Sequence, residues 1–206
     1  FLHKVYKPKT ILFFMKDKKI KNSDENNGMK YLKDVKKIEE LLIQVGLRIA
    51  KRGEGALFIV GNTEYKPLIR QQVPSFNALR NPKLLESLAL MDGAVILDKY
   101  GWVKAYGVMI KSKKTFKNFG TRHSAGLSAS YKGNLAVVIS EEDRKIRILR
   151  EGKMVMQIDA LQKNVEMSVP QAVNILESLG AGTVGAVGTS ILVPSLGVAF
   201  LPGIVL

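Results

Sequence analysis

The sequence predicts an α/β fold in which helices flank a mixed central β-sheet. From residue 29 to residue 52, apolar residues recur every three or four positions, which is the spacing of one face of an amphipathic helix. Residues 56–60 and 135–139 are uninterrupted apolar runs, which are typical of strands covered on both faces. Later apolar runs follow one another closely, so hairpins with antiparallel neighbours are expected in the same sheet.

The predicted elements follow in order along the chain. The first helix ends at Gly53, because glycine is favoured directly after a helix. Asn81-Pro82 starts a second helix, since proline suits the first helical turn. Ser168 and Gln171 have the spacing of a capping box and start a third helix that reaches about Leu179. The predicted strands are residues 56–60, 94–97, 102–110, 135–139, 146–149 and 154–158.

We expect three segments along the chain. Residues 1–28 form an N-terminal extension, with one or two strands followed by a polar loop over residues 22–28. Residues 29–160 form the main domain. Residues 161–206 add a helix and a Gly-rich apolar segment that packs on this domain.

The tail from Ser178 to Leu206 carries no charged residue and is long enough for a spanning helix of about 20 residues. Pro194 and Pro202 would interrupt such a helix, and no basic residue follows it to set an orientation. Short buried strands joined by Gly/Pro turns are therefore expected, and no membrane is expected as a partner.

The 206 residues carry a formal net charge of +14 and contain no cysteine. Without cysteine the chain cannot form disulfides, thiolate zinc sites or cysteine nucleophiles, which fits a cytoplasmic location. The basic excess attracts nucleotides and nucleic acids alike, and a solvated basic surface without a ligand explains it equally well. Interleaved basic and aromatic runs are missing from the sequence, so no nucleic acid is expected as a partner.

Three polar segments interrupt the apolar pattern, and the first is Asp92-Gly93-Ala94 between a predicted helix and a predicted strand. A carboxylate and a bare glycine backbone at such a junction can lie beside a ligand. For this segment alone, a turn-forming Asp-Gly pair without a function is the simpler explanation.

The second polar segment runs from Gly120 to Ser124 and reads Gly-Thr-Arg-His-Ser. If it forms the first turn of a helix, backbone N–H groups, hydroxyl groups, the guanidinium of Arg122 and the imidazole of His123 converge there. Such a group suits a phosphate, which arginine binds through two parallel hydrogen bonds.

The third polar segment, Ser140-Glu141-Glu142, follows the predicted strand 135–139. Ligands of open α/β sheets bind at such strand ends. The two carboxylates could hold a metal ion or belong to a solvated turn, and the residues themselves leave both explanations open.

The order of these segments resembles the diadenylate cyclase domain family. The resemblance runs from about Leu32 to Ile158 and includes the leading helix and the stretch Tyr106-Gly-Val-Met-Ile110. An Asp-Gly-Ala triplet is weak by itself, whereas its combination with Gly-Thr-Arg-His and the serine–glutamate pair is specific. The resemblance implies the fold of that domain and an enzyme that joins two ATP molecules into cyclic di-AMP.

In that family, each protomer binds one ATP, and two facing protomers let each 3′-hydroxyl attack the α-phosphorus of the other ATP. This implies ATP as substrate, a divalent Mn or Mg ion as cofactor, and a homodimer or higher oligomer. By the same resemblance, Asp92 is the catalytic residue, which activates the 3′-hydroxyl and binds the metal together with Glu142. The implied ATP-binding residues are Gly93, Ala94, Ile110, Thr121, Arg122, His123, Ser124, Ser140 and Glu141.

Three positions depart from the family pattern. Met91 stands where some members have histidine, Ser124 where arginine is common, and Gly126 where other small residues are frequent. No core motif residue is lost, so an active enzyme is expected. The alternative, a nucleotide-binding module without turnover, would keep Thr121 and Arg122 but would not need Asp92.

Overall fold

The computed structural model describes residues 22–111, 120–180, 192–193 and 198–205, with side chains over residues 34–111 and 120–177. The chain divides into two compact units, Phe1–Asp34 and Val35–Leu206. Of the first unit, the structure describes the start of one helix. All other described elements belong to the second unit.

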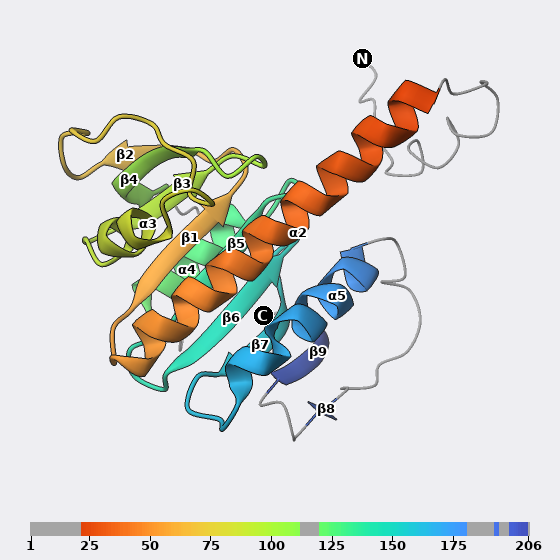
Figure 1. Cartoon of the computed structure of the whole chain (residues 1–206). Helices are drawn as coiled ribbons and strands as arrows, with labels where there is room; N and C mark the ends of the chain where they lie inside the picture. The colour runs from red at the N-terminus through yellow and green to blue at the C-terminus, as the bar shows by residue number, and fades with distance from the viewer. Residues whose placement is uncertain (1–21, 112–119, 181–191, 194–197, 206) are drawn as a thin grey trace, which may run out of the picture. The chain divides into compact units, whose positions relative to one another are not determined.

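Along the second unit, groups of two or three strands are separated by helices (Figure 1). The helices are α2 (Asn22–Lys51), which begins in the first unit, α3 (Pro82–Ala89), α4 (Thr121–Ala129), the 3₁₀ helix η1 (Val165–Ser168) and α5 (Val169–Gly180). The strands are β1 (Ala56–Val60), β2 (Tyr65–Pro67), β3 (Ala94–Leu97), β4 (Val103–Ile110), β5 (Leu135–Ile139), β6 (Lys145–Arg150), β7 (Lys153–Asp159), β8 (Leu192–Val193) and β9 (Val198–Val205).

The strands form one mixed sheet in the order β2-β4-β3-β1-β5-β6-β7-β9-β8. β1 pairs in parallel with β3 and antiparallel with β5, and the other described pairs are antiparallel. β1 and β3 can run in parallel because the connection between them is long and contains α3. The predicted mixed α/β sheet is therefore confirmed.

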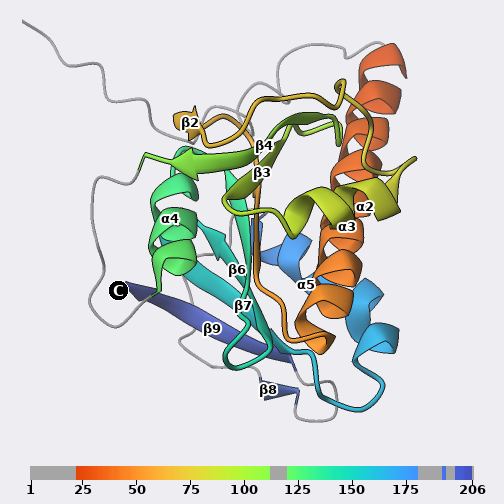
Figure 2. The same ribbon diagram turned by 90° about the vertical axis from the view of Figure 1, so that its left-hand side faces the viewer.

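Both faces of the sheet are covered (Figure 2). Helix α4 packs on one face, and helices α2, α3 and α5 pack on the other. Along β1, Phe58 points into the hydrophobic cluster that contains α2, whereas Leu57 and Ile59 point into the cluster that contains α4. Strands such as β1 and β5 lack a polar face because neither face of the sheet meets water there.

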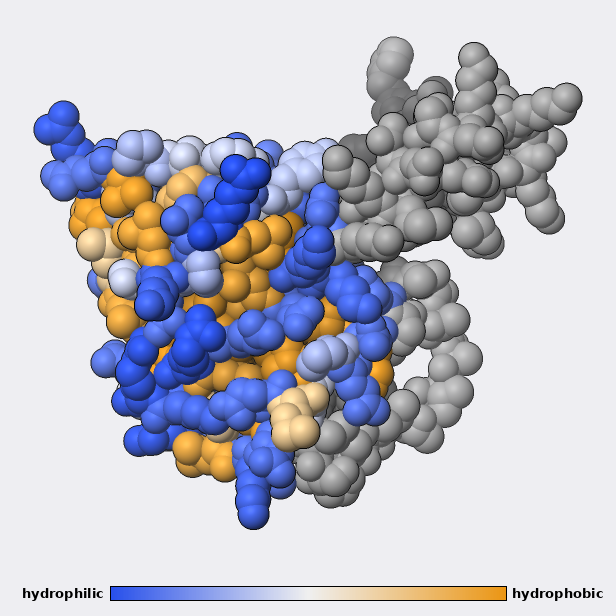
Figure 3. Space-filling model, in the orientation of Figure 1, coloured by the Kyte–Doolittle hydropathy of each residue, from blue (hydrophilic) through white to orange (hydrophobic). Residues whose placement is uncertain are grey.

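Helix α2, on the face opposite α4, turns polar side chains outward. On α2, Ile38 and Leu42 are buried, while Lys37, Gln44 and Arg48 are exposed. Figure 3 shows the resulting surface, in which hydrophilic side chains dominate and apolar areas lie between them.

One carboxyl group is buried on the inner side of α2. Glu39 is 3% exposed and forms an ion pair with Arg150 at the end of β6. Burial raises the pKa of Glu39 to about 7; the charge of Arg150 opposes this rise and the charge of Glu177 adds to it. Among the described residues, the Oε2 atom of Glu39 has no hydrogen-bond partner, so its desolvation is not fully compensated.

The start of α2 corrects one prediction. Residues 22–28, which we expected as a polar loop, form the first turns of this helix. Asp24 and Glu25 are favourable near the positive N-terminal end of a helix, which outweighs the turn tendency of the asparagines and Gly28 around them. The strands expected before residue 22 lie outside the described residues.

The C-terminal part contains the predicted helix and strands, but Pro202 and Gly203, expected in a turn, lie within strand β9 (Val198–Val205). η1 leads directly into α5, so the helix begins one residue after the predicted start at Ser168. The tail contains the strands β8 and β9, and β9 pairs with β7. Within the described ranges, no helix combines the length and the hydropathy needed to cross a lipid bilayer.

Candidate functional site

The three polar segments of the sequence lie at one edge of the sheet. β1 lies between β3 and β5 and starts after Gly55. Because β1 is parallel to β3 and antiparallel to β5, its start shares an edge with Asp92-Gly93 before β3 and with Ser140 after β5. Helix α4 begins at the same edge, since the side chain of Arg122 lies against Gly55.

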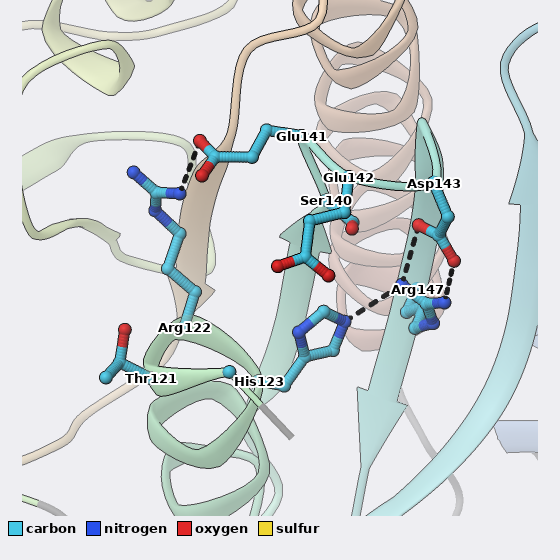
Figure 4. Close-up of a pocket in the computed structure, with 9 residues that line it drawn as sticks. Thr121, Arg122, His123, Ser140, Glu141, Glu142, Asp143 and Arg147 are labelled. Carbon is cyan, nitrogen blue, oxygen red and sulfur yellow. Dashed lines mark hydrogen bonds and ion pairs between the residues drawn. The ribbon is translucent and has the colours of Figure 1, made fainter. Parts of the chain in front are cut away.

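A cavity of about 290 Å³ lies between the first turn of α4 and the end of β5 (Figure 4). The residues that line it are Gly120, Thr121, Arg122, His123, Ser140, Glu141, Glu142, Asp143 and Arg147. The structure therefore brings the second and third polar segments together around one space.

The N-terminus of α4 opens toward this cavity. The N-cap residue Gly120 is extended (φ −60°, ψ 165°), and no described side chain caps the helix. Gly120 and Thr121 line the cavity, so the start of α4, with its first backbone N–H groups and the positive end of its dipole, lies at the cavity wall. The predicted helix start at Thr121 is confirmed, and this arrangement suits an anion.

Arg122 reaches from the first turn of α4 to the end of β5. Its Nη1 atom lies 3.1 Å from the Oε2 atom of Glu141. A Cβ atom added to Gly55 would lie 2.4 Å from the same Nη1 atom, so the guanidinium rests on the bare backbone of this glycine. Both partners of the ion pair are partly exposed, with the Arg122 side chain at 35%.

His123 and Asp143 share Arg147, which comes from β6 (Figure 4). Arg147 Nη1 lies 2.9 Å from His123 Nε2 and donates to Asp143 Oδ1 at 3.2 Å, while Nη2 donates to Asp143 Oδ2. Burial lowers the pKa of His123, and the positive charge of Arg147 lowers it further against the opposing charge of Asp143. His123 is therefore neutral at physiological pH.

The carboxyl group of Asp143 is held in its charged form. Burial raises the pKa of Asp143, but hydrogen bonds from Arg147 and Ser140, together with the charges of Arg147 and Lys145, outweigh burial and lower it. Asp143 thus acts as the fixed counter-charge of Arg147.

Glu142 is the cavity carboxylate best placed to accept a metal ion. Glu141 and Asp143 are each bound to an arginine, whereas no hydrogen bond or ion pair engages Glu142 within the described residues. The described residues contain no group of three or more metal-binding side chains. A metal would therefore need additional oxygen ligands from a bound molecule, as Mg²⁺ at phosphate sites usually has.

Asp92 and Gly93 lie at the same sheet edge but do not line the cavity. The Asp92 side chain is exposed, and its Oδ1 atom accepts a hydrogen bond of 2.9 Å from the backbone N–H of Gly93. Gly93 has a φ of 98°, and an added Cβ would lie 2.7 Å from both the N and the O atoms of Val108. Strand β4 thus already occupies the space beside this glycine.

Three other predicted residues are buried away from the cavity. Ala94 and Ile110 belong to the hydrophobic cluster that also contains Leu127 of α4. Ser124 is buried behind the first turn of α4, where its backbone N–H donates to the Gly120 carbonyl.

Sequence reasoning missed four residues of this region: Gly55, Gly120 as a lining residue, Asp143 and Arg147. Gly55 stands two residues after the glycine that ends the predicted first helix, so the sequence indicates a loop residue there and not a site residue. A signal for Arg147 exists in the sequence, because it sits between Ile146 and Ile148 and must face the opposite side of the sheet from both. The alternation predicts which face of the sheet Arg147 lies on, but it does not predict that Arg147 lines the cavity.

The chain matches a family model described as "DAC: DisA bacterial checkpoint controller nucleotide-binding" over residues 46–154, which is just over half of its length. This range includes all three polar segments and extends from the last turns of α2 to the start of β7.

Two curated relatives are named diadenylate cyclase. The protein from Haloferax volcanii is 30% identical over 138 residues, which covers 57% of this chain and 51% of that protein. The protein from Methanocaldococcus jannaschii is 31% identical over 145 residues, which covers 63% of this chain and 47% of that protein. The chain thus spans about half the length of these relatives. A solved structure of DacA from Staphylococcus aureus is 21% identical and covers 73% of this chain and 99% of that chain, with a TM-score of 0.46.

Proposed function

The chain belongs to the DAC family, and on this premise we propose that it is a diadenylate cyclase that joins two ATP molecules into cyclic di-AMP. The observation that carries the proposal is the cavity at the start of α4, where Arg122 and a helix N-terminus that no described side chain caps lie beside Glu141 and Glu142. Phosphoryl-type transfer depends on positioning and charge neutralisation, which such a site supplies.

In the proposed reaction, the 3′-hydroxyl oxygen of one ATP attacks the α-phosphorus of the other. One P–O bond forms, the bond from the α-phosphorus to the bridging β-phosphate oxygen breaks, and pyrophosphate leaves with the electron pair. The hydroxyl proton passes to a base, for which we propose the carboxylate of Asp92. The reciprocal attack closes the ring and releases the second pyrophosphate.

The triphosphate would bind at the N-terminus of α4, held by Thr121, Arg122 and His123. The exposed ion pair of Arg122 with Glu141 is weak enough for phosphate oxygens to replace the carboxylate, since such pairs contribute about 0–1 kcal/mol. We propose that Ser140 and Glu141 then lie beside the phosphates. Ser124 is buried behind the helix turn, so we propose no direct phosphate contact for it.

The adenosine would lie along the same sheet edge, toward β3 and β4. Gly93, Ala94 and Ile110 are proposed to form this part of the site. The side chains of Ala94 and Ile110 are buried in one hydrophobic cluster, so the adenine would contact the backbone of these residues rather than their side chains.

A bound Mn²⁺ or Mg²⁺ ion would neutralise phosphate charge and lower the pKa of the attacking hydroxyl. We propose that Glu142 and Asp92 hold it together with phosphate oxygens. Within the described residues, Glu142 lines the cavity and forms no hydrogen bond or ion pair, whereas Asp92 lies at the same sheet edge outside the cavity.

The second ATP would come with a second copy of the chain, because the sequence contains the Gly-Thr-Arg-His segment only once. Specific activity should therefore rise with protein concentration until dimers dominate. A specific activity that stays constant down to concentrations where light scattering shows only monomers would contradict this arrangement.

The test of the function is incubation with ATP and Mn²⁺ or Mg²⁺, followed by mass spectrometry for cyclic di-AMP. We expect the wild type to form it and Asp92→Asn to bind ATP without forming it. Asp159→Asn is the matched control. Asp159 is the last residue of β7, accepts a hydrogen bond from the Leu161 backbone N–H and lies outside the cavity. ATP binding without product with either metal, at protein concentrations that permit dimers, would instead support a nucleotide-binding module.

A further inference from the structure

The buried carboxyl group of Glu39 lies where α2, the end of β6 and α5 meet. Its Oε1 atom accepts a hydrogen bond from Nη2 of Arg150, and Nη1 of Arg150 donates to the backbone oxygen of Leu176 in α5 at 3.3 Å. Figure 2 shows α2 and α5 on the same face of the sheet. One arginine therefore connects the Glu39 carboxyl group on α2 to the C-terminal half of α5.

Apolar side chains hold α5 in place beside this carboxyl group. Val169, Val173 and Leu176 of α5 are buried in the same hydrophobic cluster as Ile38 and Leu42 of α2. None of these side chains titrates, so their contribution to the docking of α5 does not depend on pH.

Two polar contacts join α2 and α5 on the outer side. The Nζ atom of Lys36 donates to Oδ1 of Asn174 and lies 3.9 Å from Oε2 of Glu177. The side chains of Lys36 and Glu177 are 37% and 36% exposed, so water and salt screen this ion pair and it contributes little. The polar contacts on the outer side are therefore too weak to fix α5 by themselves.

Charged groups face Glu39 from each of the elements around it. Burial is the largest influence and raises the pKa of Glu39 to about 7; the charge of Arg150 opposes this rise, and the charge of Glu177 on α5 adds to it. Lys36 lies one turn earlier on α2, and Lys153 of β7 pairs in register with Arg150. Among the described residues, Oε2 of Glu39 has no hydrogen-bond partner, so the ionised carboxylate is incompletely solvated while α5 is docked.

We propose that Glu39 is a pH-sensitive latch for α5: α5 leaves its place on α2 and β6 more readily when the Glu39 carboxyl group is ionised than when it is neutral. With α5 docked, the ionised group is buried, with Glu177 nearby. When α5 is released, water reaches the carboxylate and the repulsion from Glu177 is lost. The latch needs no bound nucleotide, so it is independent of the proposed function.

The direction of the pH effect follows from the two pKa values of Glu39. The pKa is about 7 with α5 docked and 4.5 for a solvated glutamate, so the proton stabilises the docked state fully below pH 4.5, and this stabilisation is lost as the pH rises through 7. The opening constant of α5 is the ratio of released to docked helix. Between pH 5 and pH 8 it should rise by up to about 70-fold and level off above pH 7.

Hydrogen–deuterium exchange measures this constant, as the ratio of the observed exchange rate of an amide to its intrinsic rate at the same pH. We expect the amide of Val173 in α5 to have a larger opening constant than that of Val137 in the central strand β5, since α5 opens without unfolding of the sheet. The constant of Val173 should rise with pH in the wild type and change less than about twofold in Glu39→Gln, which cannot ionise.

Two further variants serve as controls. Glu40→Gln removes the neighbouring, partly exposed carboxylate that accepts a hydrogen bond from Gln44, and it should keep the wild-type rise. Glu177→Gln removes the repulsion and should give a smaller rise; because this site is partly exposed, it also tests the latch if Glu39→Gln does not fold.

Three results would overturn the latch. Equal opening constants of Val173 and Val137 at every pH would show that α5 leaves only when the whole protein unfolds. A wild-type constant that changes less than twofold between pH 5 and pH 8 would show that no ionisation controls α5. A rise in Glu39→Gln as large as that of the wild type would assign the effect to another group.

Discussion

The guanidinium of Arg122 and the carboxylate of Glu141 meet directly over Gly55, with 3.1 Å between Nη1 and Oε2. Arg122 comes from helix α4 and Glu141 follows strand β5. The two side chains can meet there because Gly55 has no side chain that would fill the space. Because the ion pair is partly exposed, it orients Arg122 without holding it tightly.

We expect Gly55→Ala to weaken ATP binding about tenfold or more. The new Cβ would lie 2.4 Å from Arg122 Nη1, and the guanidinium must move away from the cavity. Calorimetric titration with ATP measures the loss. Gly133→Ala is the control: it lies in open space at a φ of 77°, so it should lower stability by about 1 kcal/mol and leave ATP affinity unchanged. An affinity of Gly55→Ala equal to that of the wild type would contradict the positioning of Arg122 described here.

Gly93→Ala should lower the free energy of unfolding of the protein, and should not act on ligand binding alone. Its φ of 98° is unfavourable for alanine, and its Cβ would approach the Val108 backbone to 2.7 Å, which no side-chain movement can relieve. We expect a loss of about 2–4 kcal/mol in urea unfolding, with ATP binding reduced in parallel. Normal stability combined with lost binding would instead indicate that the nucleotide itself requires this glycine.

The stability of the protein should fall as the pH rises through the titration of Glu39. Its folded pKa of about 7 lies above the unfolded value of 4.5, so the folded state holds the proton more tightly, and this contribution is full below pH 4.5 and lost as the pH rises through 7. The loss between pH 5 and pH 8 is about 2 kcal/mol. Urea unfolding of the wild type should give a lower free energy of unfolding at pH 8 than at pH 5, and this decrease should be absent in Glu39→Gln.

The control for this experiment is Glu86→Gln. Although partial burial raises the pKa of Glu86, hydrogen bonds from Arg48 and Arg52 lower it overall, so its contribution is lost only as the pH falls below about 4.5. Glu86→Gln should therefore show the same decrease in the free energy of unfolding between pH 5 and pH 8 as the wild type. Equal behaviour of Glu39→Gln and the wild type would show that Glu39 is not the titrating group.

If Glu142 binds the metal as proposed, Glu142→Gln should raise the metal concentration needed for half-maximal formation of cyclic di-AMP by roughly tenfold, for the loss of one carboxylate ligand. Activity at saturating Mn²⁺ or Mg²⁺ should recover in large part, and removal of the metal by a chelator should abolish activity in both proteins. Glu64→Gln serves as the control, because this carboxylate pairs with Lys111 outside the cavity. An unchanged metal requirement would exclude Glu142 as a ligand.

The sequence predicts most elements of the fold because their signals are local. β1, β3 and β5 are short apolar runs with glycine or polar residues at one or both ends, and the observed strands match the predicted ranges. The first turn of α4 follows from Gly120 and the polar residues after it. β2 carries no such signal, since it has three exposed residues that pair with β4.

The site is less predictable because its decisive contacts join distant residues. Arg147 meets His123 across 24 positions, and this contact depends on the register of β6 against β5 and on how α4 packs over both. For Gly93, the sequence suggested room for a nucleotide, whereas the close neighbour in the structure is the backbone of Val108. A sequence motif identifies the residue types of a site, but it does not show which other residues pack against them.

The edge of the sheet opposite the cavity offers a place for chemical attachment. β1 has five residues, so the two edges are separated by roughly 15 Å of strand. At the far edge, Lys132 is exposed in the turn before β5, where Gly133 and Glu151 are joined by a hydrogen bond of 2.8 Å. Because the chain has no cysteine of its own, Lys132→Cys would give a single thiol for a dye or a solid support, with the cavity left facing the solution.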